Sequence, residues 1–251
     1  MDYLITTLAL FVLLAFIMEM IDSSLGMMYG TLLSPLLIGA GIDPLLAVPS
    51  ILLSQAVGGL GGTLSHHRFR NADFNGLTRD TKVVLAMVIP GLIAVVFGVI
   101  VGLSLPKIYV EVYIFVLVLV MSILCMLPLR FKFKWWKHYL LGIVAAFNKA
   151  LSGGGFGPVT STGGIIGGLD SRASIATTTF AEVFICFAAF IIYLIFSGKV
   201  DILLISTLCI GAMIGGLIGP YIASKVKKGR LRILVGVLGI LSSIWLLTNI
   251  V

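Results

Sequence analysis

The stretch Asn148-Lys149-Ala150-Leu151-Ser152-Gly153-Gly154-Gly155-Phe156-Gly157-Pro158 places a lysine and a run of glycines inside a chain that is otherwise strongly apolar. A lysine at bilayer depth costs about 2.5 to 3.5 kcal/mol on insertion scales, so it should face a partner or a polar cavity rather than lipid. Glycines beside it permit a broken helix, whose freed N–H groups can face a ligand where protein shields them from lipid. A lysine next to free amide donors is the outline of an anion site.

Composition gives the setting of this stretch. The chain has 251 residues, of which 59% are hydrophobic and 11% are charged, and its mean hydropathy is +1.17. A water-soluble globule of this size needs more polar residues, so we expect an all-α integral membrane protein. The net charge of +7 is also typical of nucleic-acid binders. However, the basic residues cluster in short loops between apolar runs, as cytoplasmic loops do. We therefore expect a lipid bilayer and no nucleic acid as partner, and neither metal nor cofactor.

Apolar runs predict about ten membrane segments. Their bounds are 3–22, 24–42, 44–65, 83–103, 109–129, 138–152, 154–169, 171–196, 201–224 and 232–250. The first run has neither a basic n-region nor a cleavage site, so we expect it to be a retained helix. Runs 24–42, 138–152 and 154–169 are short or interrupted by glycine and proline, and we expect broken helices or re-entrant hairpins there.

Basic residues in three connections give the orientation. The clusters are Arg68, Arg70, Arg79 and Lys82; Arg130, Lys132, Lys134 and Lys137; and Lys225, Lys227, Lys228, Arg230 and Arg232. Alternation of ten spans puts all three clusters on one face, which is then cytoplasmic. Both termini are expected on the extracytoplasmic side of the cell (inner) membrane.

An offset of 127 residues relates the two halves of the chain. It pairs Asp43 with Asp170 (170 − 43), and also Gly26 with Gly153, Gly30 with Gly157, Gly41 with Gly168, Ser34 with Ser161 and Gln55 with Glu182. Each half contains five spans, an odd number, so the halves enter the membrane from opposite faces. We expect two inverted-topology five-segment repeats, 1–130 and 131–251.

Folds of this type place their site near the midplane, where half-helix N-termini face anionic groups. We expect a small anionic substrate to be bound by Asn148, Lys149, Ser152, Gly153, Gly154, Gly155 and Gly157 of the second half and by Gly26, Tyr29, Gly30, Thr31 and Ser34 of the first. The alternative is that glycines four residues apart are packing seams between helices.

Ionisable residues at depth allow two interpretations. Asp22 is the repeat counterpart of Lys149, and an Asp22–Lys149 ion pair that merely neutralises both charges is one alternative. The other is function, because an intramembrane acid is by default a proton-relay candidate. Glu182 is the first candidate for the proton-coupling residue, since its counterpart Gln55 cannot titrate. Glu19 and Asp22 are the next candidates. The adjacent His66 and His67 are expected to be interfacial anchors rather than metal ligands.

Taken together, these motifs resemble the sulfite exporter TauE/SafE family of membrane transporters. The matching stretches are Asp22-x-x-x-Gly26-x-x-Tyr29-Gly30-x-x-x-x-Pro35, His66-His67-Arg68-x-x-Asn71-x-Asp73-Phe74 and Phe147-Asn148-Lys149-x-x-Ser152-Gly153-Gly154-Gly155-x-Gly157-Pro158. The resemblance implies a secondary transporter of small sulfur-containing oxyanions such as sulfite, organosulfonates or related organic anions, usually moved outward. The first half is poorer in glycine than in many members, so we expect the second half to dominate the site.

The resulting prediction is a proton-coupled transporter, which the resemblance implies to be an exporter, and not an enzyme. A passive anion channel is the first alternative. An intramembrane enzyme that uses Glu19, Asp22 or the histidines is the second. The sequence leaves the oligomeric state open, with a homodimer as one option.

Overall fold

The computed structural model describes residues 2–127 and 131–250, and within them the chain forms ten helices and no strand. The helices are α1 (Asp2–Leu25), α2 (Tyr29–Gly39), α3 (Pro44–Arg68), α4 (Arg79–Ser104), α5 (Lys107–Met126), α6 (Trp135–Ser152), α7 (Phe156–Ile166), α8 (Ser171–Ser197), α9 (Ile202–Lys225) and α10 (Lys228–Ile250). They follow the ten predicted runs to within a few residues, and the expected all-helical fold is confirmed.

Five helices of the described residues are long and apolar enough to cross a bilayer by length and composition. They are α3, α4, α8, α9 and the part of α1 from Thr6 to Leu25. Large apolar side chains on their outer faces are exposed; Ile93, Phe97 and Ile195, for example, are 66%, 60% and 72% accessible. An apolar surface of this extent is what lipid covers.

Helices α2 and α7 are too short to cross. Each has 11 residues, which is about 16 Å of helix against an apolar thickness of about 30 Å. The chain breaks before each of them, at residues 26–28 and 153–155, where Gly26, Met28, Gly153 and Gly155 all have positive φ. Broken helices are therefore present where the sequence predicts them. The run 138–152, by contrast, lies within one continuous helix, α6.

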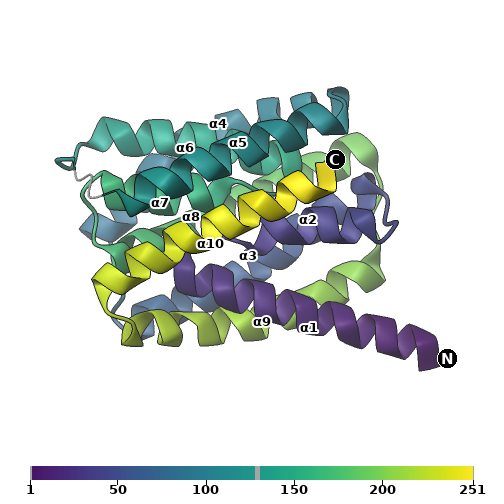
Figure 1. Cartoon of the computed structure of the whole chain (residues 1–251), viewed down its shortest axis with the longest axis horizontal. Coiled ribbons are helices and arrows are strands. Elements are labelled where there is room, and N and C mark those ends of the chain that lie inside the picture. The colour runs from purple at the N-terminus through teal and green to yellow at the C-terminus, as the bar shows by residue number, and fades with distance from the viewer. Residues whose placement is uncertain (1, 128–130, 251) are drawn as a thin grey trace.

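The two ends of the bundle differ in charge. The α5–α6 and α9–α10 connections lie at one end, and the α8–α9 connection lies at the other together with both termini (Figure 1). We call the first end, which carries residues 68–79, 131–137 and 225–227, the basic end. Helix α2 lies toward the opposite end, whereas α7 lies toward the basic end (Figure 1).

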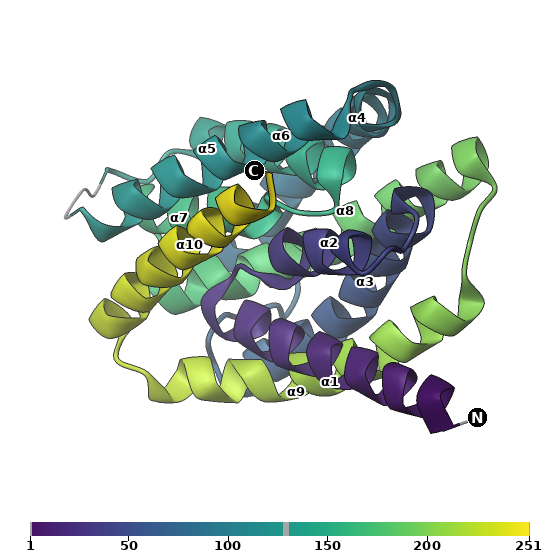
Figure 2. The same cartoon turned by 45° about the vertical axis from the view of Figure 1, so that its right-hand side comes forward.

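Helix pairing relates the two halves. Helix α1 packs along α9, and α4 packs along α6 (Figures 1 and 2); the offset of 127 residues converts the first pair into the second. Asp43 and Asp170 begin α3 and α8 in the same way, by accepting hydrogen bonds from the N–H of Leu45 (2.9 Å) and of Arg172 (3.0 Å). Such caps satisfy amide groups that a helix start leaves free. Equivalent positions of the halves thus have equivalent local geometry.

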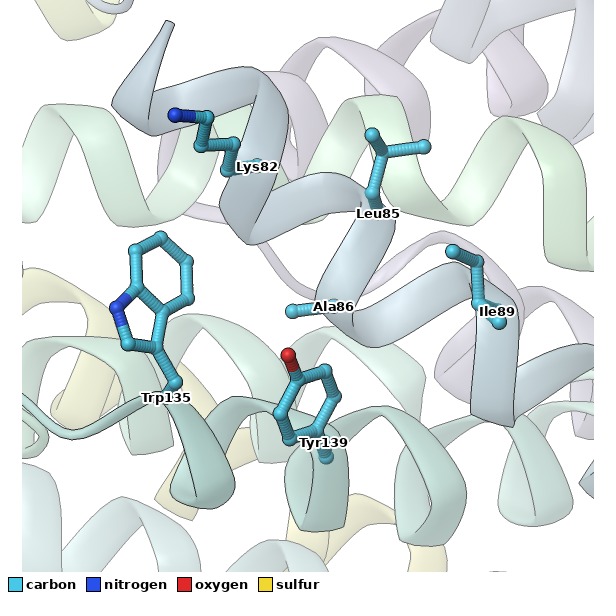
Figure 3. A pocket seen from close by; sticks show the side chains of 6 residues that line it. All are labelled: Lys82, Leu85, Ala86, Ile89, Trp135 and Tyr139. Carbon is cyan, nitrogen blue, oxygen red and sulfur yellow. The ribbon is translucent and has the colours of Figure 1, made fainter. Parts of the chain in front are cut away.

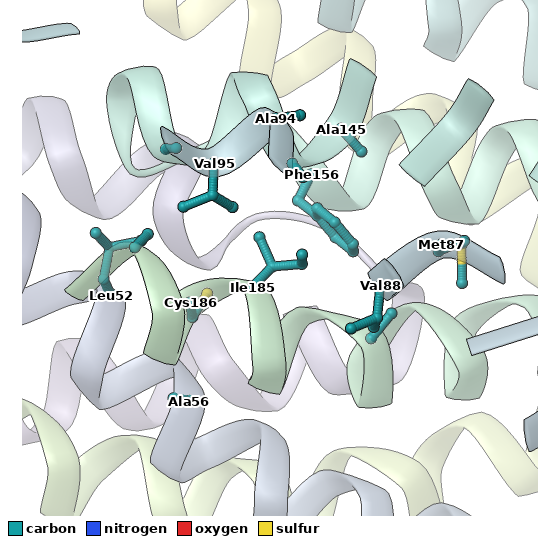
Figure 4. Close-up of a cluster of buried hydrophobic side chains, with 14 of the residues drawn as sticks. Leu52, Ala56, Met87, Val88, Ala94, Val95, Ala145, Phe156, Ile185 and Cys186 are labelled. Carbon is teal, nitrogen blue, oxygen red and sulfur yellow. The ribbon is translucent and has the colours of Figure 1, made fainter. Parts of the chain in front are cut away.

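The largest hydrophobic cluster holds the second break in place. It lies between α3, α4, α6, α7 and α8, and Figure 4 shows Val95, Phe156 and Ile185 within it. Phe156 is the first residue of α7 and is fully buried. Burial of such a side chain contributes about 1.5 to 3 kcal/mol relative to exposure. The start of α7 is therefore fixed by packing as well as by its glycines.

Candidate functional site

The two helix breaks cross each other in the middle of the bundle. A Cβ on Gly30 would collide with the carbonyl oxygen of Gly153, and a Cβ on Gly157 would collide with that of Gly26. The offset of 127 residues converts the first contact into the second. Each short helix thus begins against the carbonyl end of a long helix from the other half, and only glycine permits this approach.

Lys149 is the centre of the polar groups next to this crossing. It projects from α6 and is 1% exposed. Its ammonium group donates a hydrogen bond to Oε1 of Gln55 on α3 and lies 2.9 Å from Oε1 of Glu182 on α8. Gln55 in turn donates from Nε2 to Oδ2 of Asp22 on α1, at 3.3 Å. The four side chains form one buried chain, Asp22–Gln55–Lys149–Glu182, to which each half contributes two members.

This chain separates the two ionisable residues that the sequence pairs. Asp22 and Lys149 are joined only through Gln55, and the salt bridge of Lys149 goes to Glu182 instead. Asp22 has a second task, because its Oδ1 accepts the backbone N–H of Tyr29 at 3.1 Å. Asp22 therefore also satisfies the first amide of α2. The simple Asp22–Lys149 ion pair is not what the structure contains.

Buried carboxyl groups outnumber buried amines near the crossing. Among the side chains that the structure describes, Glu19, Asp22, Glu182 and Lys149 are the buried members of the Asp, Glu, Lys and Arg classes. Glu19 accepts a hydrogen bond from Ser23 at 2.9 Å, but its Oε2 has no hydrogen-bond partner among the residues that the structure describes. One ammonium balances one carboxylate, and an unbalanced buried charge costs several kcal/mol. The cluster therefore favours protons or counter-ions on its remaining acids.

The glycine-rich break is lined with hydroxyl groups that occupy its amides. The N–H of Gly154 donates to Oγ of Ser152 at 3.2 Å, and the N–H of Gly155 donates to Oγ1 of Thr31 at 3.3 Å. The amides expected to bind an anion thus have protein acceptors here. Because a hydroxyl group both donates and accepts, Thr31 can also donate to an anion. The hydroxyl of Ser152 donates to the carbonyl of Asn148 at 3.1 Å, so it can donate to an anion only by giving up that bond.

Asn148 faces away from the Lys149 chain. Its Oδ1 accepts a hydrogen bond from the Tyr113 hydroxyl on α5, at 2.8 Å. Its Nδ2 is buried and has no partner in the described residues. Neighbouring residues on a helix point in directions about 100° apart, so Asn148 and Lys149 serve different sides of α6. The structure therefore does not bring Asn148 together with Lys149, and its side chain lies on the α5 side of α6.

A cavity of about 270 Å³ reaches the crossing from the end opposite the basic loops. Its lining includes Ser34 of α2, Ser152 of α6 and Tyr193 of α8, beside apolar residues of α3 and α4. The hydroxyl of Tyr193 donates to the carbonyl of Ala150 at 3.1 Å. Ser34 and Ser152, which come from different halves, are thus brought to one wall of a single cavity.

Sequence reasoning omitted Gln55, Ser54 and Tyr113 from the site. Ser54 is hydrogen-bonded to the hydroxyl of the predicted Tyr29 at 2.7 Å. The repeat offset, which pairs Gln55 with Glu182, was the available signal for Gln55. No comparable signal identifies Ser54 or Tyr113, because their roles depend on which helices touch.

The histidine motif builds a loop rather than a binding site. His66 is fully buried, and its Nδ1 lies 3.0 Å from Nδ2 of Asn71, which also donates to the carbonyl of Pro220 on α9. The expectation of an interfacial anchor is therefore wrong for His66. His67 is partly exposed and accepts the N–H of Phe74 at 3.2 Å. The motif ties the α3–α4 connection to α9.

Comparison with known proteins agrees with this architecture. The family model described as "Sulfite exporter TauE/SafE" matches residues 11–246. A protein of Bacillus subtilis (strain 168) named "Probable membrane transporter protein YtnM" is 30% identical over an alignment of 245 residues, and the match covers 91% of this chain and 79% of that protein. The region that the family model matches contains both helix breaks and all four members of the buried chain. Family and relative both indicate a transporter rather than an enzyme.

Proposed function

Because the chain belongs to the sulfite exporter TauE/SafE family of membrane transporters, we propose that it is a proton-coupled secondary transporter that moves small sulfur-containing oxyanions out of the cell. The substrate class comprises sulfite, organosulfonates and related organic anions. The protein lies in the cell (inner) membrane with both termini on the extracytoplasmic side.

The observation that carries this proposal is the position of Lys149 between Gln55 and Glu182 at the crossing of the helix breaks. An oxyanion that reaches Lys149 competes with Glu182 for its ammonium group. A proton on Glu182 removes the competing charge and frees the ammonium for the anion. Proton and anion then favour each other's binding, which is the coupling that cotransport needs.

The rest of the anion site comes from groups beside Lys149. Ser152 and Thr31 rotate their hydroxyl groups to donate, and the amides of Gly154 and Gly155 then turn to the anion. Tyr29 and Ser34 complete the site from the first half, and Gly26, Gly30, Gly153 and Gly157 allow the close approach of the two breaks.

We further propose that residues 1–130 and 131–251 form two inverted repeats that exchange access between the two sides. Support comes from the reciprocal contacts Gly30–Gly153 and Gly157–Gly26. It also comes from the half-length α2 and α7, which lie toward opposite ends. In such folds one repeat rocks against the other around a fixed midplane site. The cavity at Ser34 and Ser152 is then the extracytoplasmic exit, and its volume of about 270 Å³ suits a small oxyanion.

The direction of transport sets a condition on charge. An inside-negative potential drives each net negative charge outward by about 2.3 kcal/mol per 100 mV. Export by this coupling therefore requires an anion that carries more negative charge than the protons that accompany it. Fully deprotonated sulfite, a dianion, meets that condition with one proton. A monoanionic organosulfonate moved with one proton is electroneutral, so the potential does not drive it and it leaves the cell only down its own concentration gradient.

Vesicles containing the purified protein test the proposal. Sulfite, a short alkanesulfonate and acetate are supplied at equal concentrations, with the membrane potential clamped at zero and the outside made acidic. We expect the two sulfur oxyanions to accumulate inside above their external concentration, and acetate to behave as it does in protein-free vesicles. Equilibration without accumulation would identify a passive channel instead.

A further inference from the structure

A groove between α4 and α6 opens on the outer surface of the bundle at its basic end. Figure 3 shows Trp135 and Tyr139 projecting from α6 toward α4, whose Lys82, Ala86 and Ile89 form the other wall. The cavity here measures about 540 Å³. Tyr139 and Ile89 are 46% and 63% exposed, so the groove is open to the membrane and is not part of the site at Lys149.

The groove continues inward and loses its polar residues. A second cavity, of about 430 Å³, is lined by Ile93 and Phe97 of α4, Val144 and Phe147 of α6 and Tyr113 of α5. Its α4 wall begins at Pro90, directly after Ile89, so the two cavities follow one another along the same pair of helices. An amine and two amphipathic aromatic rings thus precede a mostly apolar section, in which the Tyr113 hydroxyl is bonded to Asn148. This is the polarity profile of a phospholipid.

A tight seam closes the floor of the groove. A Cβ on Gly142 of α6 would collide with the backbone of Met87 on α4, and a Cβ on Gly91 would lie 3.1 Å from that of Ala146. The helices therefore touch directly beneath the groove, so an occupant can enter only from the lipid side.

The charges at the mouth favour an anionic occupant. The ammonium group of Lys82 forms no ion pair or hydrogen bond with any residue that the structure describes. Lys134, which directly precedes Trp135 in the sequence, is exposed. The guanidinium of Arg79 stacks on the ring of Phe133 at 4.4 Å. The nearby Asp80 is turned toward the loop, where its Oδ2 accepts the N–H of Asp73 at 2.8 Å. Interfacial lysine together with tryptophan and tyrosine suits an anionic headgroup.

This chemistry is specific to one half of the chain. The offset of 127 residues places Cys209, Leu8 and Val12 at the counterparts of Lys82, Trp135 and Tyr139. The equivalent α9–α1 pair therefore has neither the lysine nor the aromatic residues. A second copy of the chain is also disfavoured as the occupant. A two-fold dimer in a membrane would bring the basic ends of both copies together on this face.

We propose that the α4–α6 groove binds one anionic phospholipid, with its phosphate at Lys82, Trp135 and Tyr139 and an acyl chain along Ile93 and Val144. The occupant is a lipid rather than free phosphate, because the apolar section of the groove requires an acyl chain.

Fluorescence quenching by brominated lipids tests this site. In a protein carrying Trp136→Phe and Trp245→Phe, Trp135 is the remaining tryptophan. This protein is placed in phosphatidylcholine vesicles to which acyl-brominated phosphatidylglycerol or acyl-brominated phosphatidylcholine is added. We expect half-maximal quenching at a mole fraction of brominated phosphatidylglycerol about fivefold lower than for brominated phosphatidylcholine, the effect of one lysine near an anionic headgroup.

Two variants separate the headgroup from the acyl chain. Lys82→Gln should remove the preference for phosphatidylglycerol, whereas Lys227→Gln, a matched exposed lysine at the same end, should keep it. Val144→Phe narrows the apolar section and should weaken quenching by both lipids. Equal quenching of the parent protein by both lipids, or a preference that survives Lys82→Gln, would overturn the proposal. So would a Trp135 whose fluorescence neither brominated lipid quenches.

Discussion

At the residue scale, Lys149 has two roles that mutations can separate: it neutralises Glu182 in the folded protein, and it binds the anion. Lys149→Ala leaves Glu182 without its partner, and removal of one member of a buried ion pair costs about 3 to 5 kcal/mol. We expect a lower unfolding temperature in detergent and an anion affinity reduced by about tenfold or more. Adding Glu182→Gln removes the unpaired charge, so it should restore most of the stability and none of the affinity. Thermal unfolding and titration calorimetry measure the two effects.

Recovery of anion affinity in that double variant would mean that Lys149 serves only to neutralise Glu182. Glu19→Gln is the matched control for the carboxyl change. Glu19 is also buried, but its hydrogen bond goes to Ser23 rather than to Lys149. We expect it to leave the defects of Lys149→Ala unchanged.

Depth in the membrane was enough to predict that Lys149 faces a partner or a polar cavity, because charge at depth is costly. The partners themselves were predicted less well. The salt bridge goes to Glu182 rather than Asp22, and this depends on how α8 packs against α6. The direction of Asn148 toward Tyr113 likewise depends on the position of α5. Sequence periodicity gives the face of a helix but not the neighbour that covers it.

At the scale of elements, the glycines have both of the roles that the sequence allowed. Gly153 and Gly155 permit the break between α6 and α7 through their positive φ. Gly30 and Gly157, in contrast, are packing positions against the carbonyls of the other break. Chain breaks are local and could be predicted from glycine and proline. The crossing of two breaks from different halves is not local. The only feature of the sequence that indicated it was the equal spacing of the glycines in the two halves.

Helix α2 contains a matched pair of glycines that tests this crossing. A Cβ at Gly30 would collide with the backbone of Gly153, whereas a Cβ at Gly39 would meet nothing within 4 Å. Overpacking against a close-packed neighbour typically costs about 1 to 3 kcal/mol. We expect Gly30→Ala to lower the unfolding temperature and Gly39→Ala to leave it unchanged or slightly higher. Equal effects of the two substitutions would mean that the breaks do not touch.

At the scale of the whole molecule, the proposed topology can be mapped by labelling. The protein with its three cysteines replaced by serine receives a single cysteine at one of several loop positions. Membrane-impermeant reagent should reach Arg70→Cys, Lys132→Cys and Lys227→Cys only from the cytoplasm, and Lys199→Cys only from outside. Labelling of position 227 from outside would exclude the inverted repeats, because the two halves would then not enter from opposite faces.

Composition and hydropathy were sufficient to predict a membrane protein that is all-helical, and the described residues form ten helices. They gave no means of predicting that α1 pairs with α9 and α4 with α6, since these helices are far apart in sequence and similarly apolar. The 127-residue offset could predict that the two pairs are equivalent, but not that either exists. The arrangement follows from side-chain packing along small-residue seams such as Gly142 against Met87, which hydropathy does not describe.

The coupling of proton to anion at Glu182 is the central claim, and simultaneous flux measurement tests it most directly. Vesicles with clamped potential receive an alkanesulfonate, whose charge does not change with pH, while a trapped dye reports internal protons. We predict that wild-type protein carries protons inward with the anion, and that Glu182→Gln carries the anion without them. Proton movement that persists in Glu182→Gln, or anion movement without protons in the wild type, would contradict the claim.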